Sequence, residues 1–284
     1  MMIIADSGST KTDWAICHGA GEVKYLTGVG LNPFFVSEDE VAAEVERVIG
    51  KGRASDEHTV FWFYGAGCSN ELRKSIVRNG LKRIFPGASV HVHHDLLGAA
   101  RALCRNDPGV ACILGTGSNS CLYDGKEIID NIKALGYVLG DEGSGADLGK
   151  ALVRAYAYRE MPTDIAESFT ALTGGVESIL EAVYNQPLAN RYLASFAPFC
   201  SEWLAHPFMK KLVENRFACF VERHLLKYSS VTSLTVHFVG SVAFHFAEIL
   251  TQVCNSRGLQ TGTILKRPID ALIEYHNGEF HRPA

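Results

Sequence analysis

Short apolar stretches separated by polar turns open the chain, and their order predicts a sheet that begins with a hairpin. Residues 3–5 form an apolar strand, which breaks at the polar turn of residues 6–10. Residues 12–17 and 23–27 continue the pattern as two further strands, joined by a turn at residues 19–22. The first part of the chain is therefore predicted to form three strands connected by short turns.

Helices then alternate with strands. Ser37 is expected to begin the first helix, because a glutamate three residues later completes a capping box. Ser69 is expected to begin the second helix, and the third covers residues 95–105. Strands are predicted at residues 60–64, which are apolar enough to be buried, and at residues 90–94. This order is typical of the ribonuclease-H-like fold.

The same plan restarts after Pro108. The second half is predicted to contain a strand, a glycine turn, a hairpin, a helical insertion, a strand, a helix and a final helix. These elements cover residues 110–114, 115–119, 120–131, 144–230, 234–239, 241–250 and 269–275. We therefore predict an α/β protein with two ribonuclease-H-like domains, residues 1–108 and 109–267, the second carrying the helical insertion. A cleft between them would be the usual place for a small-molecule site. The last segment, about residues 268–284, could pack back on the first domain.

Composition narrows the class of protein. The 284 residues include 27 basic and 31 acidic side chains, so that the net charge is -4, and no basic run indicates nucleic acid as a partner. The sequence shows no signal peptide and no apolar run long enough to span a membrane. The eight cysteines form no Cys-x-x-Cys pair, as expected for buried thiols in a reducing compartment. We expect a cytoplasmic protein.

The common phosphate-binding fingerprints do not occur. The chain lacks Gly-x4-Gly-Lys-Ser/Thr, and no strand is followed by Gly-x-Gly-x-x-Gly. Instead, each half has a polar turn between its first two strands, at residues 6–12 and 115–119. Successive backbone amides in such turns can bind phosphate oxygens, and the hydroxyls of Ser9, Thr10 and Thr116 add donors. Ordinary hairpin turns are the alternative, but two turns at equivalent positions favour a phosphate site.

Carboxylates stand beside the predicted turns. Asp6 ends the first strand and could hold a magnesium ion through water. Asp95 follows the fifth strand, where it could be a helix N-cap or a general base for an alcohol substrate. Asp141 lies among glycines, where it could bind sugar hydroxyls or favour the start of a helix. His91 and His93 share one face of a strand but have no third ligand that would indicate zinc.

Six short motifs, in chain order, carry a resemblance to a known family. They are Asp6-Ser7-Gly8-Ser9-Thr10-Lys11-Thr12, Asn32-Pro33, Asp95-Leu96-Leu97-Gly98-Ala99, Gly115-Thr116-Gly117-Ser118-Asn119, Gly140-Asp141-Glu142-Gly143-Ser144 and Val239-Gly240-Ser241-Val242. Over nearly the full chain, this set resembles the BadF/BadG/BcrA/BcrD ATPase family of the actin-like ATPase superfamily, in particular its N-acetylglucosamine kinase branch. The resemblance implies a sugar kinase that uses ATP and Mg²⁺, and it suggests a homodimer.

The resemblance also implies roles for particular residues. ATP and its phosphates would be bound by Asp6, Gly8, Ser9, Thr10, Lys11, Thr116, Gly117, Gly240 and Ser241. The sugar would be held by Asn32, Asp95, Ser118, Asn119 and Asp141. Asp95 would be the base for the 6-hydroxyl of the sugar, and Asp6 would hold Mg²⁺, through water.

Three alternatives stay open. The substrate could be N-acetylmuramic acid or glucosamine instead of N-acetylglucosamine. Other members of the family activate dehydratases or reductases with an iron–sulfur cluster held by cysteines, but the corresponding positions, residues 95–97 and 141–143, contain no cysteine. A nucleotide-binding regulator with an actin-like core is the third alternative, against which Asp95 argues.

Overall fold

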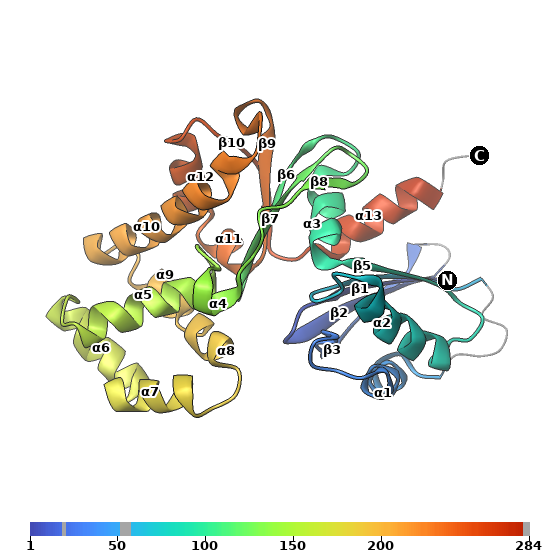
Figure 1. The fold of residues 1–284 in the computed structure, drawn as a ribbon, viewed down its shortest axis with the longest axis horizontal. Coiled ribbons are helices and arrows are strands. Elements are labelled where there is room, and N and C mark those ends of the chain that lie inside the picture. Colours follow the sequence, from blue (N-terminus) through green and yellow to red (C-terminus); the bar gives the residue numbers. More distant parts are fainter. Residues whose placement is uncertain (19–20, 52–57, 281–284) are drawn as a thin grey trace. The chain divides into compact units, whose positions relative to one another are not determined.

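A computed structural model of the chain describes residues 1–18, 21–51 and 58–280. These residues form two compact units, each built around one five-stranded sheet (Figure 1). The first unit contains Met1–Asn106, Gly125–Glu127 and the segment from Arg267 onward, and the second contains Asp107–Asp124 and Ile128–Lys266. The predicted α/β class is confirmed.

The first unit has the strand order β3-β2-β1-β4-β5. The strands are β1 (Met2–Ser7), β2 (Lys11–Cys17), β3 (Val23–Val29), β4 (Val60–Gly65) and β5 (Ser89–His94). The pairs β1–β2 and β2–β3 are antiparallel, whereas β1–β4 and β4–β5 are parallel. The hairpin that opens the sequence therefore forms one side of a mixed sheet. The turn predicted at residues 19–22 lies partly outside the described residues.

Helices cover both faces of this sheet (Figure 1). The helices are α1 (Glu38–Ile49), α2 (Glu71–Ile84), α3 (Asp95–Cys104) and α13 (Ile269–Phe280). On one face, Ile3 and Ala5 of β1 pack in a core with α1 and α2, and on the other, Met2 and Ile4 pack with α3 and α13. Both faces of β1 are therefore buried, as its continuous apolar run requires.

Two predicted helix starts differ in outcome. The capping box at Ser37 is present, because its hydroxyl accepts from the amide of Glu40 while the carboxylate of Glu40 accepts from the amide of Ser37. Ser69 does not begin the second helix. The N-cap of this helix is Asn70, whose side-chain oxygen accepts a hydrogen bond from the amide of Arg73 at 3.0 Å. Both serine and asparagine are favourable N-caps, and the sequence Ser-Asn offers them side by side.

The second unit repeats the strand plan of the first. Its order is β8-β7-β6-β9-β10, with β6 (Gly109–Leu114), β7 (Ser118–Tyr123), β8 (Ile128–Asp130), β9 (Thr235–Val239) and β10 (Gln260–Leu265). The pairs β6–β7 and β7–β8 are antiparallel, and β6–β9 and β9–β10 are parallel. The strand β10 was not predicted from the sequence, since it is a largely exposed edge strand interrupted by Gly262.

A helical segment separates β8 from β9 in the second unit. It contains α4 (Gly136–Leu139), α5 (Gly145–Ala157), α6 (Thr163–Thr173), α7 (Val176–Tyr184), α8 (Ala189–Ala194), α9 (Ala197–Glu202), α10 (Pro207–Arg223) and the 3₁₀ turns Leu225–Lys227 and Val231–Ser233. The helices α11 (Ser241–His245) and α12 (Ala247–Asn255) follow β9. No helix in the part of the chain that the structure describes is long and apolar enough to cross a membrane.

Candidate active site

The first unit has its candidate site at one edge of its sheet. The parallel strands β1, β4 and β5 end side by side there, since Ser7 pairs in register with Gly65 and Gly65 with His94. Ligands of open α/β sheets bind at the C-terminal ends of parallel strands. The polar turn after β1, the glycine-rich loop after β4 and the start of α3 therefore share one edge.

The turn between β1 and β2 exposes its small residues. The amide of Gly8 donates to the carbonyl of Lys11 at 2.9 Å, which closes the turn. Ser7 and Thr12, on either side, are buried, and their hydroxyl oxygens lie 2.8 Å apart. Gly8 and Thr10 are exposed. The backbone of the turn thus faces solvent, as a phosphate-binding turn requires.

Asn32 connects this turn to neighbouring loops. The side chain is buried, its Nδ2 donates to Oγ of Ser9 at 2.7 Å, and its Oδ1 accepts from the amide of Phe34 at 3.0 Å. A Cβ at Gly67 would lie 2.1 Å from the same Oδ1, so only glycine fits beside it. The structure therefore brings together Asn32, predicted to bind sugar, and Ser9, predicted to bind phosphate.

Asp6 lies partly buried near the end of β1. Burial first, and then the carboxylates of Asp95 and Asp13, raise its pKa to about 7, while Lys11 lowers it. A divalent cation would relieve this repulsion. In the described ranges, no three His, Cys, Asp or Glu side chains form a group that could hold a metal ion. A cation at Asp6 would thus take most of its ligands from water and phosphate, which is the usual coordination of Mg²⁺.

Asp95 is the first residue of α3, and His94 occupies the N-cap position that was the alternative for Asp95. Its Oδ1 accepts a hydrogen bond from the amide of Leu96 at 2.8 Å and lies 2.7 Å from Nδ1 of His94. The carboxyl side chain is 25% exposed. It is therefore held at the sheet edge and can still be reached by a substrate.

In the second unit, the glycine turn between β6 and β7 is docked on a helix. The amide of Gly115 donates to the carbonyl of Gly117 at 3.0 Å and closes the turn. The first amides of α5 then hold it, because Gly145 donates to the carbonyl of Gly115 (2.8 Å) and Ala146 donates to that of Thr116 (3.1 Å). Backbone hydrogen bonds thereby fix the turn on α5.

A cavity of about 530 Å³ opens beside this turn. Its walls come from the turn, the start of α5, the α8–α9 segment and α11. They are formed by Gly115, Thr116, Gly145, Ala194, Ser195, Ala197, Pro198, Ser201, Glu202, Ser241, Val242, His245 and Phe246. Gly240 has a φ of 127°, and a Cβ there would lie 2.2 Å from the carbonyl oxygen of Leu114. This glycine lets the start of α11 approach β6, which brings Ser241 and Thr116 to one cavity.

Asp141 lies against the other end of the same turn. A Cβ at Gly117 would lie 2.9 Å from its Oδ2, and the amide of Ser118 hydrogen-bonds to its carboxylate. Burial raises the pKa of Asp141 above its ordinary value, against the effect of that hydrogen bond. Beside it, Oγ of Ser118 is buried and has no hydrogen-bond partner among the residues that the structure describes. A buried hydroxyl without a partner is costly, so this position favours a polar ligand.

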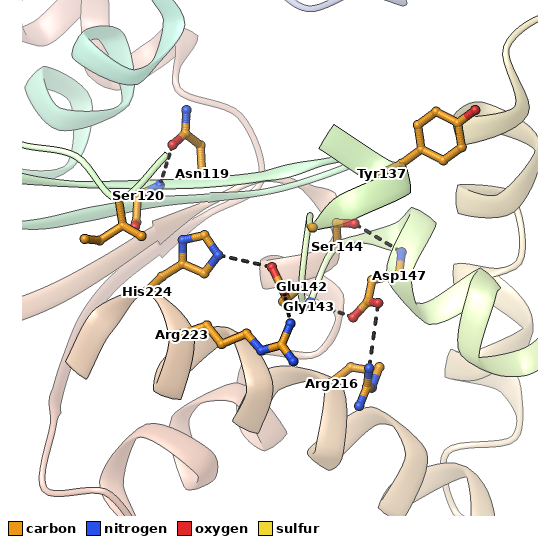
Figure 2. A network of polar contacts seen from close by, with 12 residues as sticks. Asn119, Ser120, Tyr137, Glu142, Gly143, Ser144, Asp147, Arg216, Arg223 and His224 are labelled. Carbon is orange, nitrogen blue, oxygen red and sulfur yellow. Dashed lines mark hydrogen bonds and ion pairs between the residues drawn. The ribbon is translucent and has the colours of Figure 1, made fainter. Parts of the chain in front are cut away.

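Asn119, also predicted to bind sugar, has partners within the protein. Its Oδ1 accepts from the amide of Ser120 at 2.9 Å (Figure 2) and from Nδ2 of Asn131 at 3.0 Å. Asn131 also donates to the carbonyl of Ser120 at 2.7 Å. The side chain of Asn119 is thus oriented by the residue that follows β8, and its Nδ2 remains the group that a ligand would meet.

The loop that carries Asp141 is anchored from two helices (Figure 2). Glu142 is buried, and its carboxylate contacts Arg223 at 2.5 Å and Nε2 of His224 at 3.2 Å, both at the end of α10. From α5, Asp147 accepts a hydrogen bond from the amide of Gly143 at 3.0 Å. Asp141 itself has a φ of 59°, a conformation that side chains rarely adopt. These anchors hold the loop in a shape that its backbone alone would not favour.

Comparison with solved structures connects these sites to known proteins. A proposed N-acetylglucosamine kinase from Porphyromonas gingivalis is 41% identical, with 99% of this chain and 100% of that chain covered and a TM-score of 0.92. The chain belongs to the sugar kinases of the actin-like ATPase superfamily. A proposed N-acetylglucosamine kinase from Chromobacterium violaceum shares the fold at 16% identity, with 96% and 98% of the two chains covered and a TM-score of 0.75.

A more distant solved structure shares the fold of this superfamily as well. It is a ROK family glucokinase from Streptomyces griseus in complex with glucose and AMPPNP, at 15% identity, 97% and 98% coverage and a TM-score of 0.52. No protein-family model matches the chain, and no curated protein matches it. The two-domain actin-like fold predicted from the sequence is confirmed.

Sequence reasoning about this sugar kinase missed several residues that shape the site. A Cβ at Gly30 would lie 2.4 Å from the carbonyl oxygen of Gly8, so Gly30 lets two loops touch. Asn131 orients Asn119 from the position after β8. Gly30 lies two residues before the Asn32-Pro33 motif, and this proximity could have drawn attention to it. Nothing in the local sequence pairs Asn131 with Asn119.

Proposed function

We propose that the protein transfers the γ-phosphoryl group of ATP to an amino sugar, and that N-acetylglucosamine, phosphorylated at its 6-hydroxyl, is its substrate. We further place the chain in the BadF/BadG/BcrA/BcrD ATPase family. The likeness to the Porphyromonas gingivalis protein along the whole chain supports the class of reaction. The observation that carries the choice of ligand is the pair formed by the partly buried carboxylate of Asp141 and the buried hydroxyl of Ser118, which has no partner among the described residues. Such a pair suits a substrate rich in hydroxyl groups.

The nucleotide would use the second unit. The cavity of about 530 Å³, with Thr116 and Ser241 on its walls, has a volume suited to the adenosine. Gly117 belongs to the same turn, and Gly240 brings α11 to it. AMPPNP in the Streptomyces griseus glucokinase supports ATP as the phosphoryl donor.

The first unit would supply phosphate contacts and the base. The exposed turn of Gly8, Ser9, Thr10 and Lys11 offers backbone amides to phosphate oxygens. Asp95 would accept the proton of the 6-hydroxyl as the oxygen attacks the γ-phosphorus, and the bond to ADP breaks. A Mg²⁺ ion held at Asp6 through water would neutralise charge on the phosphates. Asn32, Ser118, Asn119 and Asp141 would orient the sugar.

The test is an assay of ADP release with Mg-ATP and a panel of N-acetylglucosamine, N-acetylmuramic acid, glucosamine, neutral hexoses and glycerol. We expect strong stimulation by N-acetylglucosamine and a product phosphorylated at the 6-hydroxyl, with little response to glycerol. Response to another amino sugar alone would change the substrate but keep the class. Sugar-independent ATPase activity would favour the activator alternative, and tight ATP binding without turnover would favour a regulator.

A further inference from the structure

Three polar atoms meet at the start of α3. Nδ1 of His94 lies 2.7 Å from Oδ1 of Asp95. The amide nitrogen of Leu96 lies 2.8 Å from the same Oδ1 and 3.1 Å from Nδ1 of His94. Both side chains are partly buried, with 31% of His94 and 25% of Asp95 exposed. The contact is thus sheltered from water yet adjacent to the surface that a substrate would reach.

The position of the proton follows from the chemistry of the three groups. An ionised carboxylate only accepts hydrogen bonds, so a contact of 2.7 Å with Nδ1 requires that the imidazole carry its proton on Nδ1. A protonated Nδ1 cannot accept a hydrogen bond, so the amide of Leu96 donates to Oδ1 of Asp95 at 2.8 Å and not to Nδ1 at 3.1 Å. Both donors meet Oδ1 of Asp95, which leaves Oδ2 as the oxygen that can take a proton from a substrate.

We propose that His94 is a positioning residue for Asp95, and that its Nδ1–H fixes which carboxylate oxygen acts as the base. This inference rests on the proposed function, in which Asp95 accepts the proton of a sugar hydroxyl. A charge-assisted hydrogen bond restricts the rotation of the carboxyl group. A base that is misplaced by about 1 Å can lose about 100-fold in rate, so holding Oδ1 has a direct effect on turnover.

The simpler alternative is that His94 only caps α3. The two other histidines of β5 show that a histidine ring on this strand can have contacts away from Asp95. His91 is exposed, and its ring stacks on Trp62 with centroids 4.2 Å apart. His93 stacks on the same ring at 6.0 Å. Of the three, His94 is the one whose ring contacts Asp95. The test must therefore separate capping from positioning.

Four variants make this separation. His94→Ala removes both functions, His94→Ser restores a favourable N-cap but places no donor at the imidazole position, and His94→Asn restores the cap and an N–H donor. His91→Ala is the matched control on the same strand. The measurements are kcat and KM for N-acetylglucosamine and ATP, together with the thermal unfolding midpoint of each protein.

We expect His94→Ala and His94→Ser to lower kcat by about 10- to 100-fold with little change in the KM for ATP. His94→Asn should recover most of the loss, and His91→Ala should match the wild type. Recovery by His94→Ser, or an unchanged kcat in His94→Ala, would reduce His94 to a helix cap and overturn the proposal. A wild-type protein that phosphorylates no sugar would instead overturn the proposed function, and with it the role of Asp95 as base.

A spectroscopic readout does not depend on turnover. In ¹⁵N NMR spectra of the folded wild-type protein, the ring of His94 should carry its proton on Nδ1, and Asp95→Ala should abolish that preference. A wild-type ring protonated on Nε2 alone would contradict the hydrogen bond and overturn the proposal even in an active enzyme.

Discussion

The two units of the molecule use the same sheet and give its functional edge opposite characters. Both have the order of a hairpin, a central strand and two parallel strands, and both have a glycine turn after the first strand. At the first turn, the carboxyl groups of Asp13 and Asp95 lie close enough to Asp6 to add to the rise in its pKa that burial causes. At the second, the turn itself carries no charge and borders a cavity. The backbone frame thus provides amides twice, and side chains decide the chemistry.

The inserted segments explain part of this difference. Among the described residues, the first unit has one α-helix, α1, between β3 and β4, whereas the second unit has seven, α4 to α10, between β8 and β9. Those helices form cavity walls at Pro198 and Glu202 and anchor Glu142 through Arg223. A repeated fold therefore acquires a nucleotide-sized cavity by insertion, while the unit without the insertion keeps an open, acidic edge.

The largest expected effect tests the acidic edge of the first unit. Asp95→Asn keeps the shape of the side chain but removes its ability to accept a proton. We expect kcat for sugar phosphorylation to fall by about 100- to 10,000-fold, the range for loss of a general base. Because the cavity and glycine turn of the second unit are unaffected, ATP binding measured by calorimetry should be nearly unchanged. Wild-type turnover in this variant would show that Asp95 is not the catalytic base, and that the difference between the two units does not extend to catalysis.

The second prediction concerns the charge that the first unit concentrates at Asp6. Its pKa is raised from 3.8 to about 7, so between these values the folded protein binds more protons than the unfolded chain. The stability contributed by this group therefore falls as pH rises through that range and stays low above pH 7. Asp6→Asn removes the penalty, which is a few kcal/mol at most.

The measurement is thermal unfolding of wild type and Asp6→Asn without nucleotide from pH 4 to pH 8. The variant should be equally stable near pH 4 and increasingly more stable toward pH 7, with a constant difference above it. Its Mg²⁺-dependent turnover should nevertheless be lost. Equal unfolding midpoints at pH 8 would show that the fold does not raise the pKa of Asp6.

The sequence predicted the parts of both units that depend on local pattern. The strand–turn–strand order, the capping box at Ser37 and the helical segment after Ser144 follow from the spacing of apolar residues and from cap chemistry. The strand β10 was missed because an exposed edge strand with Gly262 has little alternation to detect. Periodicity reports which face of a helix or strand is buried. It therefore does not detect a strand of which neither face is buried.

Contacts across long sequence separations were the other gap. The motif around Asp141 pointed to a functional loop, but the partners that hold it, Arg223 and His224, lie about 80 positions away. The contact between His94 and Asp95 was local, yet its geometry depends on rotamers that spacing does not determine. Motifs thus pointed to candidate residues, whereas the residues that orient them could be found only in the fold.

Two glycines test whether the two ends of the turn between β6 and β7 bind different ligands. A Cβ at Gly115 would enter open space beside the cavity, whereas one at Gly117 would lie 2.9 Å from Oδ2 of Asp141. We expect Gly115→Ala to raise the KM for ATP and Gly117→Ala to raise the KM for the sugar. Each change should be about 5- to 30-fold, corresponding to overpacking by about 1–2 kcal/mol.

The two glycine variants act as controls for one another in steady-state kinetics on one preparation of each protein. Neither glycine has a positive φ, so alanine is compatible with both backbones. The same parameter changing in both variants would show that the turn serves a single ligand, and would weaken the distinction between the cavity and the Asp141 end.

The smallest expected effect concerns buried hydroxyls, where the two units differ most clearly. In the first unit, the hydroxyls of Ser7 and Thr12 form a hydrogen bond across the turn, whereas in the second unit Oγ of Ser118 has no partner in the described part of the chain. Ser118→Ala should therefore leave the unliganded protein at least as stable, because an unsatisfied buried group is removed. It should raise the KM for the sugar by about 5- to 12-fold, the loss of one hydrogen bond of about 1–1.5 kcal/mol.

Ser120, two positions along the same strand, is the matched control. Its hydroxyl is buried and lies 2.8 Å from the hydroxyl of Tyr228, so Ser120→Ala leaves a buried partner incompletely bonded. That variant should lower the thermal unfolding midpoint and leave the KM for the sugar unchanged, the reverse of Ser118→Ala. If Ser118→Ala instead destabilised the protein and bound sugar as the wild type does, its hydroxyl would be a structural group like Ser7, and the second unit would lose its clearest sign of a polar ligand.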